Sequence, residues 1–256
     1  MFSKVDVLQV VELRTRTGRR KKGLVIVEGL PEFRRTVEAK AQIERLYICE
    51  KIVPLDAFDF KPFNPVLISK DEFAQIAFGS RLKGVLAFCR PKQLTLADLK
   101  KKKDPLLLVL ESIEKPGNLG TIIRSCDAAG VDAVICCDQK TEIYNQHVVR
   151  SSIGSLFSVS VVSADKKETI AYLQKNKIQI LPTSAHAQKV YNTVDLKRAS
   201  AIVIGSEHKG VSKEFIENAS EFIKIPMRGV SSSLNAAMSA SILCFEADRQ
   251  RRMVSG

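Results

Sequence analysis

The sequence has no long apolar run, and this absence excludes several classes of protein. None of its hydrophobic stretches reaches the roughly 18 residues that a membrane-spanning helix requires. The N-terminal segment MFSKVDVLQVVELRTRTGRRKKG lacks the apolar centre of a secretory signal. We therefore expect a protein without membrane spans, located in the cytoplasm.

Cysteine and histidine are too few and too scattered for a disulfide framework or a metal site. The six cysteines include no C-x-x-C pair, and most lie inside apolar runs such as VICCD. The three histidines are far apart, and no H-E-x-x-H motif is present. The expectation is a set of buried, reduced thiols and no bound metal.

The sequence also lacks several well-known catalytic and nucleotide-binding motifs. It contains no G-x-x-x-x-G-K-[ST], and no G-x-G-x-x-G follows a strand. A G-x-S-x-G turn is absent as well. These absences argue against a phosphate-cradling loop, a nucleotide-dependent oxidoreductase and a serine hydrolase.

Positive charge is abundant, and it is unevenly distributed. The formal net charge is +12 over 256 residues. Residues 1–104 hold 22 Lys+Arg and 13 Asp+Glu, a net of +9, which leaves +3 for residues 105–256. Because cations near phosphates release counterions, a basic N-terminal region favours nucleic-acid binding over a merely solvated surface. The candidate residues for this binding are those of the densest cluster: Arg14, Arg16, Arg19, Arg20, Lys21 and Lys22.

The pattern of the chain predicts two α/β domains. A polar segment with four consecutive lysines and flanking prolines separates them, as expected of a linker or an exposed connecting helix. The predicted boundaries are 1–95 for a small α/β sandwich, 96–104 for the linker and 105–256 for a second, larger domain. In the first domain an amphipathic helix precedes alternating strands and helices.

The second domain reads as a parallel sheet. Its short apolar runs are rich in Val and Ile, as in strands buried on both faces, and helical segments separate them. The predicted strands are 106–112, 133–137, 157–162, 178–184, 201–206 and 222–227, and the predicted helices are 118–129, 141–153, 166–176, 213–219 and 234–251. In such a doubly wound domain the ligand binds at the carboxyl ends of the strands.

Three loops after predicted strands are rich in small and polar residues: 111–124, 205–212 and 225–241. In the first, Pro116 and Gly117 predict a tight turn into a helix whose free backbone N–H groups can face a ligand. The other two contain Gly205, Gly210 and a serine run, which also allow tight turns.

Structural roles are an alternative for some of these residues. Glu207 could be a carboxylate near a helix N-terminus that Ser212 caps, and Ser232 or Ser233 could cap the last helix. Such capping leaves Asn235 unexplained, because Asn is a poor helix former unless its side chain bonds something.

These loops carry a family resemblance. Residues 118–135, 203–212 and 225–251 resemble, in order and spacing, the three signature motifs of the SpoU family of TrmH-like RNA 2′-O-ribose methyltransferases, within the SPOUT superfamily. Residues 147–159 look like the family's intervening segment, and the N-terminal part is similar to the substrate-binding domain often fused ahead of it. The resemblance covers nearly the whole chain, and three ordered motifs make it specific.

The resemblance implies a fold and an activity. The fold is a parallel-sheet domain with a deep trefoil knot, which is a rare exception to unknotted topology. The activity is methylation of a ribose 2′-hydroxyl with S-adenosylmethionine as cofactor, in a homodimer whose active sites form at the subunit interface. Ribosomal RNA is the favoured substrate over transfer RNA, and the modified nucleotide is left open.

The resemblance also implies site residues by matching position. Thr183, Gly205, Ile225 and Leu234 would contact S-adenosylmethionine, with Met227 lining the pocket. The catalytic positions are Asn118, Arg124, Glu207, Ser233 and Asn235. One departure concerns the second motif, where many relatives have Asn and this chain has Ser206.

Arg124 occupies the position to which the family assigns activation of the nucleophile. Because a guanidinium is effectively always protonated, we expect it to bind the adjacent phosphate and stabilise the developing alkoxide, while the proton acceptor is left open. The alternative function is a catalytically inactive RNA-binding or assembly protein of the same fold. The intact set of catalytic residues argues against that alternative.

Overall fold

The computed structural model describes residues 2–253, which form two units. The first unit comprises the residues up to 92 together with 144–158, and the second comprises 93–143 together with the residues from 159 on. The segment 144–158 therefore packs with the first unit, although the sequence pattern assigned it to the catalytic domain.

The second unit is built on a five-stranded parallel sheet in the order β7-β6-β5-β10-β8. Its strands are β5 (Leu106–Glu111), β6 (Ala133–Cys137), β7 (Ser160–Ala164), β8 (Gln179–Pro182) and β10 (Ser200–Ile204). All residues of β5, β6, β8 and β10 are buried, which explains their continuous apolar runs. The predicted parallel-sheet domain is confirmed.

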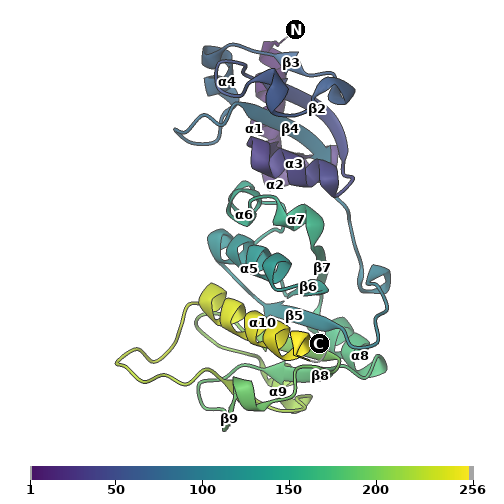
Figure 1. Cartoon of the computed structure of the whole chain (residues 1–256), viewed down its shortest axis with the longest axis vertical. Coiled ribbons are helices and arrows are strands. Elements are labelled where there is room, and N and C mark those ends of the chain that lie inside the picture. Colours follow the sequence, from purple (N-terminus) through teal and green to yellow (C-terminus); the bar gives the residue numbers. More distant parts are fainter. Residues whose placement is uncertain (1, 254–256) are drawn as a thin grey trace. The chain divides into compact units, whose positions relative to one another are not determined.

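Helices cover both faces of this sheet (Figure 1). They are α5 (Pro116–Ala128), α8 (Lys166–Lys175), α9 (Lys213–Glu217) and α10 (Ala236–Arg252). Leu107 and Val109 of β5 pack in one core cluster with residues of α8 and α9, so the alternate residues of β5 face the other side. On that side α5 packs against α10, and the Ser125 and Ser241 hydroxyls lie 2.7 Å apart.

Two strand predictions were wrong in this unit. The run 222–227 does not join the main sheet, because only β11 (Ile223–Lys224) is extended and it pairs with β9 (Lys189–Val190). The run 157–162 begins too early, because α7 (Ser155–Ser158) is helical and β7 starts at Ser160. Both runs are apolar because they are partly buried, and short apolar runs do not distinguish strand from other buried structure.

The segment that joins the two predicted domains is neither a free linker nor a helix of several turns. It contains one short 3-10 turn, η3 (Leu96–Asp98). Leu99 is buried in the core of the second unit, Leu94 packs against that core, and Leu94 also forms an isolated bridge to Val162 of β7. Leu94 and Leu99 therefore fix this segment on the second unit.

The first unit is an α/β sandwich around a four-stranded sheet in the order β1-β4-β2-β3. The strands are β1 (Val25–Glu28), β2 (Gln42–Ile48), β3 (Val66–Leu67) and β4 (Val85–Arg90), and only the β2–β3 pair is parallel. Its helices are α1 (Lys4–Arg14), α2 (Arg16–Lys22), α3 (Leu30–Glu38) and α4 (Lys70–Ile76), and the segment 144–158, here called the inserted segment, adds α6 (Gln146–Ser152) and α7. Two 3-10 turns, η1 (Leu55–Ala57) and η2 (Lys61–Phe63), also belong to this unit, whereas η4 (Tyr191–Thr193) belongs to the second. Separate apolar clusters lie on the two faces of the sheet, one with α1 and α4 and one with α3.

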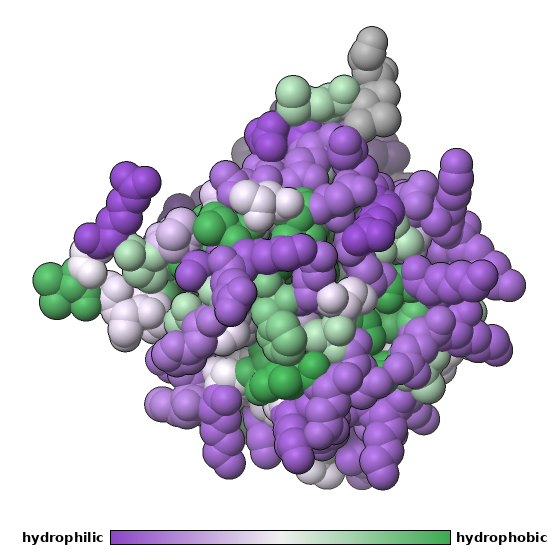
Figure 2. All heavy atoms as spheres, turned by 90° about the horizontal axis from the view of Figure 1, so that it is seen from below, coloured by the Kyte–Doolittle hydropathy of each residue, from purple (hydrophilic) through white to green (hydrophobic). Residues whose placement is uncertain are grey.

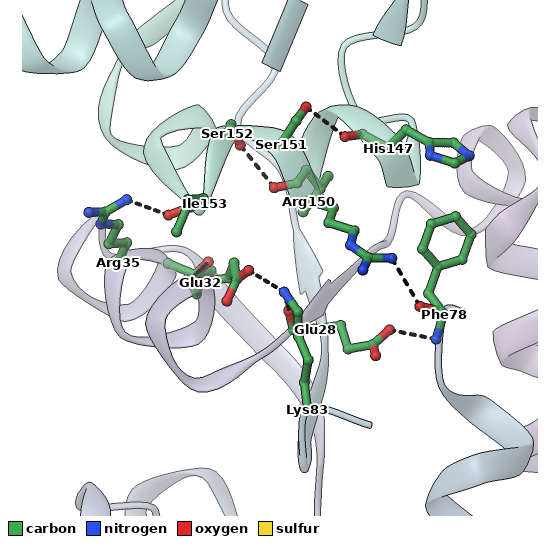
Figure 3. Close-up of polar contacts among 12 residues, drawn as sticks. Glu28, Glu32, Arg35, Phe78, Lys83, His147, Arg150, Ser151, Ser152 and Ile153 are labelled. Atoms are coloured by element: carbon green, nitrogen blue, oxygen red, sulfur yellow. Dashed lines mark hydrogen bonds and ion pairs between the residues drawn. The ribbon is translucent and has the colours of Figure 1, made fainter. Parts of the chain in front are cut away.

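The inserted segment is held on this unit by arginines (Figure 3). The Arg35 guanidinium of α3 donates to the carbonyl of Ile153 at 2.5 Å, and Arg150 of α6 donates to the carbonyl of Phe78 at 3.3 Å. Gly154 permits close approach, because a Cβ there would lie 3.1 Å from the Cα of Glu32. The contact between α7 and α3 is therefore fixed by backbone groups as well as side chains.

Two buried glutamates lie in the same region (Figure 3). Glu28 is 6% exposed; its Oε2 accepts from the Phe78 N–H at 2.9 Å, and its Oε1 has no hydrogen-bond partner among the described residues. Burial raises the pKa of Glu28 to about 7, although Lys83 and Arg14 oppose this shift. Glu32 is 3% exposed and pairs with the Lys83 ammonium.

Cysteine burial agrees with the sequence pattern. All six cysteines are free thiols with buried side chains. Among residues 2–253, no helix combines the length and apolarity of a membrane span, and no group of His, Cys, Asp and Glu has the arrangement of a metal site.

Candidate active site

The three small-residue loops meet at one edge of the parallel sheet. β5 and β10 are neighbours, with Leu110 opposite Ile204, so the loops that follow them lie side by side. The third loop, 225–235, leads from β11 into α10 and extends away from the rest of the unit (Figures 1 and 2). Figure 2 shows hydrophobic atoms at its end within a largely hydrophilic surface, and Val230 of this loop is fully exposed.

A cavity of about 430 Å³ lies between these loops. This volume is in the range of small-molecule and cofactor sites. The cavity is lined by all five residues that the sequence assigned to cofactor contact: Thr183, Gly205, Ile225, Met227 and Leu234. Its wall combines apolar side chains with many backbone groups of glycine and serine.

Close packing of two glycines shapes the second loop. A Cβ on Gly205 would lie 2.0 Å from the carbonyl carbon of Gly210, so no larger residue fits at this position without movement of the loop. The backbone N–H groups of Ser206 and Gly210 each donate to the other's carbonyl, at 3.1 and 3.0 Å. The loop therefore folds back on itself and presents its backbone to the cavity.

Thr183 ties the next strand to this loop. Its backbone N–H and its hydroxyl both donate to the carbonyl of Val203, at 2.9 and 3.0 Å. The side chain thus secures the end of β8 beside the end of β10, where both strands reach the cavity.

Three of the predicted catalytic side chains form a hydrogen-bonded chain. The Asn118 amide nitrogen donates to Glu207 Oε1 at 2.7 Å, and the Asn235 amide nitrogen donates to Asn118 Oδ1 at 3.2 Å. Glu207 and Asn235 line the cavity, as does the fourth predicted residue, Ser233. One residue from each motif is therefore linked at the cavity.

Asn235 has a second role, which explains its position next to a helix. It is the N-cap of α10, and its Oδ1 accepts from the Ala237 N–H at 2.8 Å. The helix thus begins two residues later than predicted, and neither Ser232 nor Ser233 caps it. Ser212 occupies the N-cap position of α9, but among the described residues its side chain makes no capping hydrogen bond.

Arg124, the remaining predicted catalytic residue, does not line the cavity of its own chain. It lies on α5, and its side chain is exposed. Among the described residues, no hydrogen bond joins its guanidinium to Glu207, whose Oε1 accepts from Asn118.

The basic cluster predicted to bind RNA is divided between surface and interior. Arg19 is 6% exposed and donates to the carbonyls of Leu13 and Arg14, so its guanidinium serves the fold. Arg14 is partly buried and donates to the carbonyls of Ile76 and Ala77.

The other four residues of the cluster are exposed and remain candidates for RNA contact. They are Arg16, Arg20, Lys21 and Lys22. All four belong to α2, so they lie within two turns of one helix.

Several residues that line the cavity were not predicted from the sequence. Lys115 directly precedes the predicted turn, and Lys224 is the last residue of β11; both line the cavity and bring positive charge to it. Ser184, Ser232 and Ser239 also line it. Lys115, Ser232 and Ser239 lie inside the small-residue loops, and Ser184 and Lys224 lie at the ends of strand segments, so their position in the chain was the signal that could have identified them.

Comparison with family models accounts for most of the chain. Residues 105–245 match the model described as the SpoU rRNA Methylase family. Residues 4–87 match the model described as the MRM3-like substrate binding domain. The catalytic-domain match includes all three loops of the cavity.

Individual relatives agree with these matches. The chain is 25% identical over 235 residues to the 23S rRNA (guanosine(2553)-2'-O)-methyltransferase RlmP of Bacillus subtilis (strain 168), covering 91% of this chain and 92% of the relative. It is 36% identical over 181 residues to the 23S rRNA (guanosine-2'-O-)-methyltransferase RlmB of Vibrio vulnificus (strain CMCP6), covering 68% and 73%.

A solved structure extends the likeness to the fold. The SpoU methyltransferase AviRb from Streptomyces viridochromogenes, in complex with the cofactor AdoMet, matches with a TM-score of 0.88 and 26% identity, covering 99% of this chain and 100% of that one. The chain belongs to the SpoU rRNA methylase family.

Proposed function

We propose that this protein is an RNA methyltransferase that transfers the methyl group of S-adenosylmethionine to a ribose 2′-hydroxyl of ribosomal RNA, in the cytoplasm. The observation that carries the proposal is the convergence of the three motif loops on one cavity of about 430 Å³. The names of its relatives supply the substrate class, since both are 23S rRNA 2′-O-methyltransferases.

The cavity fits S-adenosylmethionine in size and in chemistry. Apolar side chains such as Ile225 and Leu234 suit the adenine ring, while the glycine and serine backbone groups suit its polar edges and the ribose. The Glu207 carboxylate gives this part of the wall the negative charge that a sulfonium cation favours. When bound, the cofactor supplies a methyl group on an electron-poor carbon.

The protein's task is then to place and activate the ribose hydroxyl. In-line transfer requires the nucleophilic oxygen to lie about 3 Å from the methyl carbon and on its axis. We assign Asn118, Glu207, Ser233 and Asn235 to positioning the ribose and the RNA backbone at the cavity. Arg124 stabilises the developing alkoxide and the adjacent phosphate, because its permanent charge suits that role and not the role of a base.

The first experiment is titration calorimetry of the protein with S-adenosylmethionine, followed by methyl transfer to ribosomal RNA. Wild type should bind the cofactor and methylate the RNA. Gly205→Ala should weaken binding at least tenfold, because the new Cβ collides with Gly210. Gly117→Ala is the matched control, since a Cβ there meets nothing within 4 Å.

Two results would overturn this function. Absence of cofactor binding by wild type would leave a catalytically inactive RNA-binding protein of the same fold. Methylation of a base in place of the ribose would refute the assigned acceptor. Mapping of the methyl group within the modified nucleotide distinguishes base from ribose methylation.

We further propose that the active protein is a homodimer in which each cavity receives Arg124 of the partner. Arg124 is exposed on α5 and outside its own cavity. On the adjacent helix α10, Met238 and Phe245 are 56% and 44% exposed and lie seven residues, or two turns, apart on one face. A subunit interface that completes the site requires an apolar face beside a catalytic arginine that does not reach its own cavity. The exposed face of α10 and Arg124 of α5 provide these two features.

Complementation tests the shared site. Arg124→Ala and Asn235→Ala should each be at least tenfold less active than wild type as homodimers. Mixed dimers should regain activity, because one of their two sites combines an intact cavity with an intact arginine. An equal mixture should reach about a quarter of the wild-type rate. Failure of the mixture to regain activity, with mixed dimers verified by mass, would contradict a shared site.

We also propose that the domains follow the predicted boundaries in sequence, 1–95, 96–104 and 105–256, with 144–158 packed on the first unit, and that the catalytic domain contains the family's trefoil knot. The matched ranges 4–87 and 105–245 support these boundaries. Stretching single molecules from their two ends tests the knot, because a tightened knot leaves the unfolded chain shorter than its full contour length.

A further inference from the structure

A lysine and three carboxylates lie beneath the second loop of the site. The Lys166 ammonium, at the start of α8, is 3.0 Å from Glu214 of α9, 3.4 Å from Asp138 and 3.5 Å from Glu111. The neighbouring carboxylates raise the pKa of Lys166 against the effect of its desolvation, and Lys166 helps to lower the pKa of Glu214. One cation thus joins the ends of β5 and β6 to two helices.

Glu111 is the member of this network that reaches the site loop. It is the last residue of β5 and is 4% exposed. Its Oε2 accepts from the backbone N–H of Ser212 at 2.8 Å, while Oε1 faces Lys166. Ser212 ends the loop that begins at Gly205, so the carboxylate fixes the far end of that loop.

The near end of the same loop is fixed differently. Gly205 continues directly from β10, and the Ser206–Gly210 hydrogen bonds close the turn. Glu207 lies between these two fixed ends, where it meets Asn118. Val211 and Phe215 also pack in the core beside the far end of the loop. The Glu111 contact is the side-chain hydrogen bond from β5 to this loop, so without it Glu207 and the backbone that lines the cavity would be less firmly positioned.

We propose that Glu111 and Lys166 are positioning residues for methyl transfer: they hold the 205–212 loop, and through it Glu207, without contacting either substrate. Neither lines the cavity. Lys166 balances part of the charge of Glu111, which would otherwise be a buried anion with only a backbone donor. This inference rests on the proposed function and adds to it two residues that no motif contains.

Graded substitutions of Glu111 test the role. Glu111→Ala removes the acceptor and the charge, and should weaken S-adenosylmethionine binding about tenfold and lower kcat more than tenfold. Glu111→Gln keeps an acceptor for the Ser212 N–H and should recover most of the cofactor affinity. Amide hydrogen exchange of residues 206–212 should accelerate at least tenfold in Glu111→Ala and less in Glu111→Gln.

Two controls separate positioning from general stability. Lys102→Gln breaks an ion pair with Asp132 beside the amino end of β5, and it should leave binding and kcat unchanged. In a double-mutant cycle, Glu111→Gln should lower kcat severalfold in wild type but less than twofold in the Glu207→Gln background, since its effect is exerted through Glu207. A residue with a merely structural role would give the same factor in both backgrounds.

The outcomes are distinct from those of the proposed function. If wild type binds and transfers the methyl group while Glu111→Ala keeps its affinity, kcat and slow exchange, the positioning role is wrong and the function stands. Equal factors in the two backgrounds also overturn it. If wild type neither binds the cofactor nor transfers the methyl group, the function fails and this inference falls with it.

Discussion

Buried charges of the first unit contrast with the charges at the cavity of the second unit. In the first unit, Arg19, Glu28 and Glu32 are each at most 6% exposed; Arg19 and Glu28 bind backbone groups, and Glu32 pairs with the Lys83 ammonium. In the second unit, Glu207 and Lys115 lie at the wall of an open cavity. A charge inside the fold acts on stability and its pH dependence, whereas a charge at a cavity can act on a ligand without large cost to the fold. Substitutions in the two units should therefore separate these two kinds of effect.

The largest effect is expected at Arg124. Arg124→Ala should lower the single-turnover rate of methyl transfer by about 10²–10³, the cost of losing one preorganised donor to a developing oxyanion. The affinity for S-adenosylmethionine should stay within twofold, because the proposed role of Arg124 is to contact the ribose oxygen and the phosphate of the RNA and not the cofactor. Near-wild-type turnover by this variant would refute the assignment.

Substitution of Asn235 tests whether one residue of the second unit contributes both to stability and to methyl transfer. Asn235→Ala should lose about 1 kcal/mol of stability through the lost N-cap, and at least tenfold in kcat through the lost bond to Asn118. Asn235→Asp keeps a capping oxygen but lacks the donor, so it should retain the melting temperature and still lose activity. Equal loss of both properties in the two variants would contradict this separation.

Substitution of Glu28 should change the stability of the fold without changing the rate of methyl transfer (Figure 3). Its pKa of about 7 exceeds the ordinary 4.5, so the folded state holds the proton more tightly than the unfolded state. The free energy of unfolding should therefore fall as the pH rises from 4.5 through 7. Glu28→Gln keeps an acceptor for the Phe78 N–H and should remove that fall, a gain on the order of 3 kcal/mol at pH 8. Denaturant titration at several pH values measures it, and an unchanged pH profile would contradict a raised pKa.

The smallest effects are expected from the exposed cations of α2. Arg20→Gln with Lys21→Gln should weaken RNA binding severalfold and reduce the salt dependence of affinity by about one to two ion equivalents, without loss of stability. Arg19→Met is the comparison within the same helix, and it should destabilise the fold because two carbonyls lose their donor. Filter binding at several salt concentrations and thermal unfolding distinguish the two variants.

The sequence by itself determined most of the catalytic unit. Buried parallel strands show as continuous Val- and Ile-rich runs, and their carboxyl ends must lie along one edge of the sheet. Residues that follow β5 and β10 could therefore be assigned to one site before any coordinates, and Asn118, Glu207 and Asn235 do meet there. The family resemblance supplied the individual roles, which spacing alone does not give.

The tertiary structure alone decided which side chains are available and what supports them. A cluster of cations in a helix does not reveal which of them turns inward, so Arg19 and Arg20 look alike in sequence although one is buried. The packing of 144–158 with the first unit and the contact between Glu111 and Ser212, 101 residues apart in the chain, depend on packing between distant segments. Local patterns record which surfaces are apolar, but the partner of each surface is fixed only when the whole chain folds.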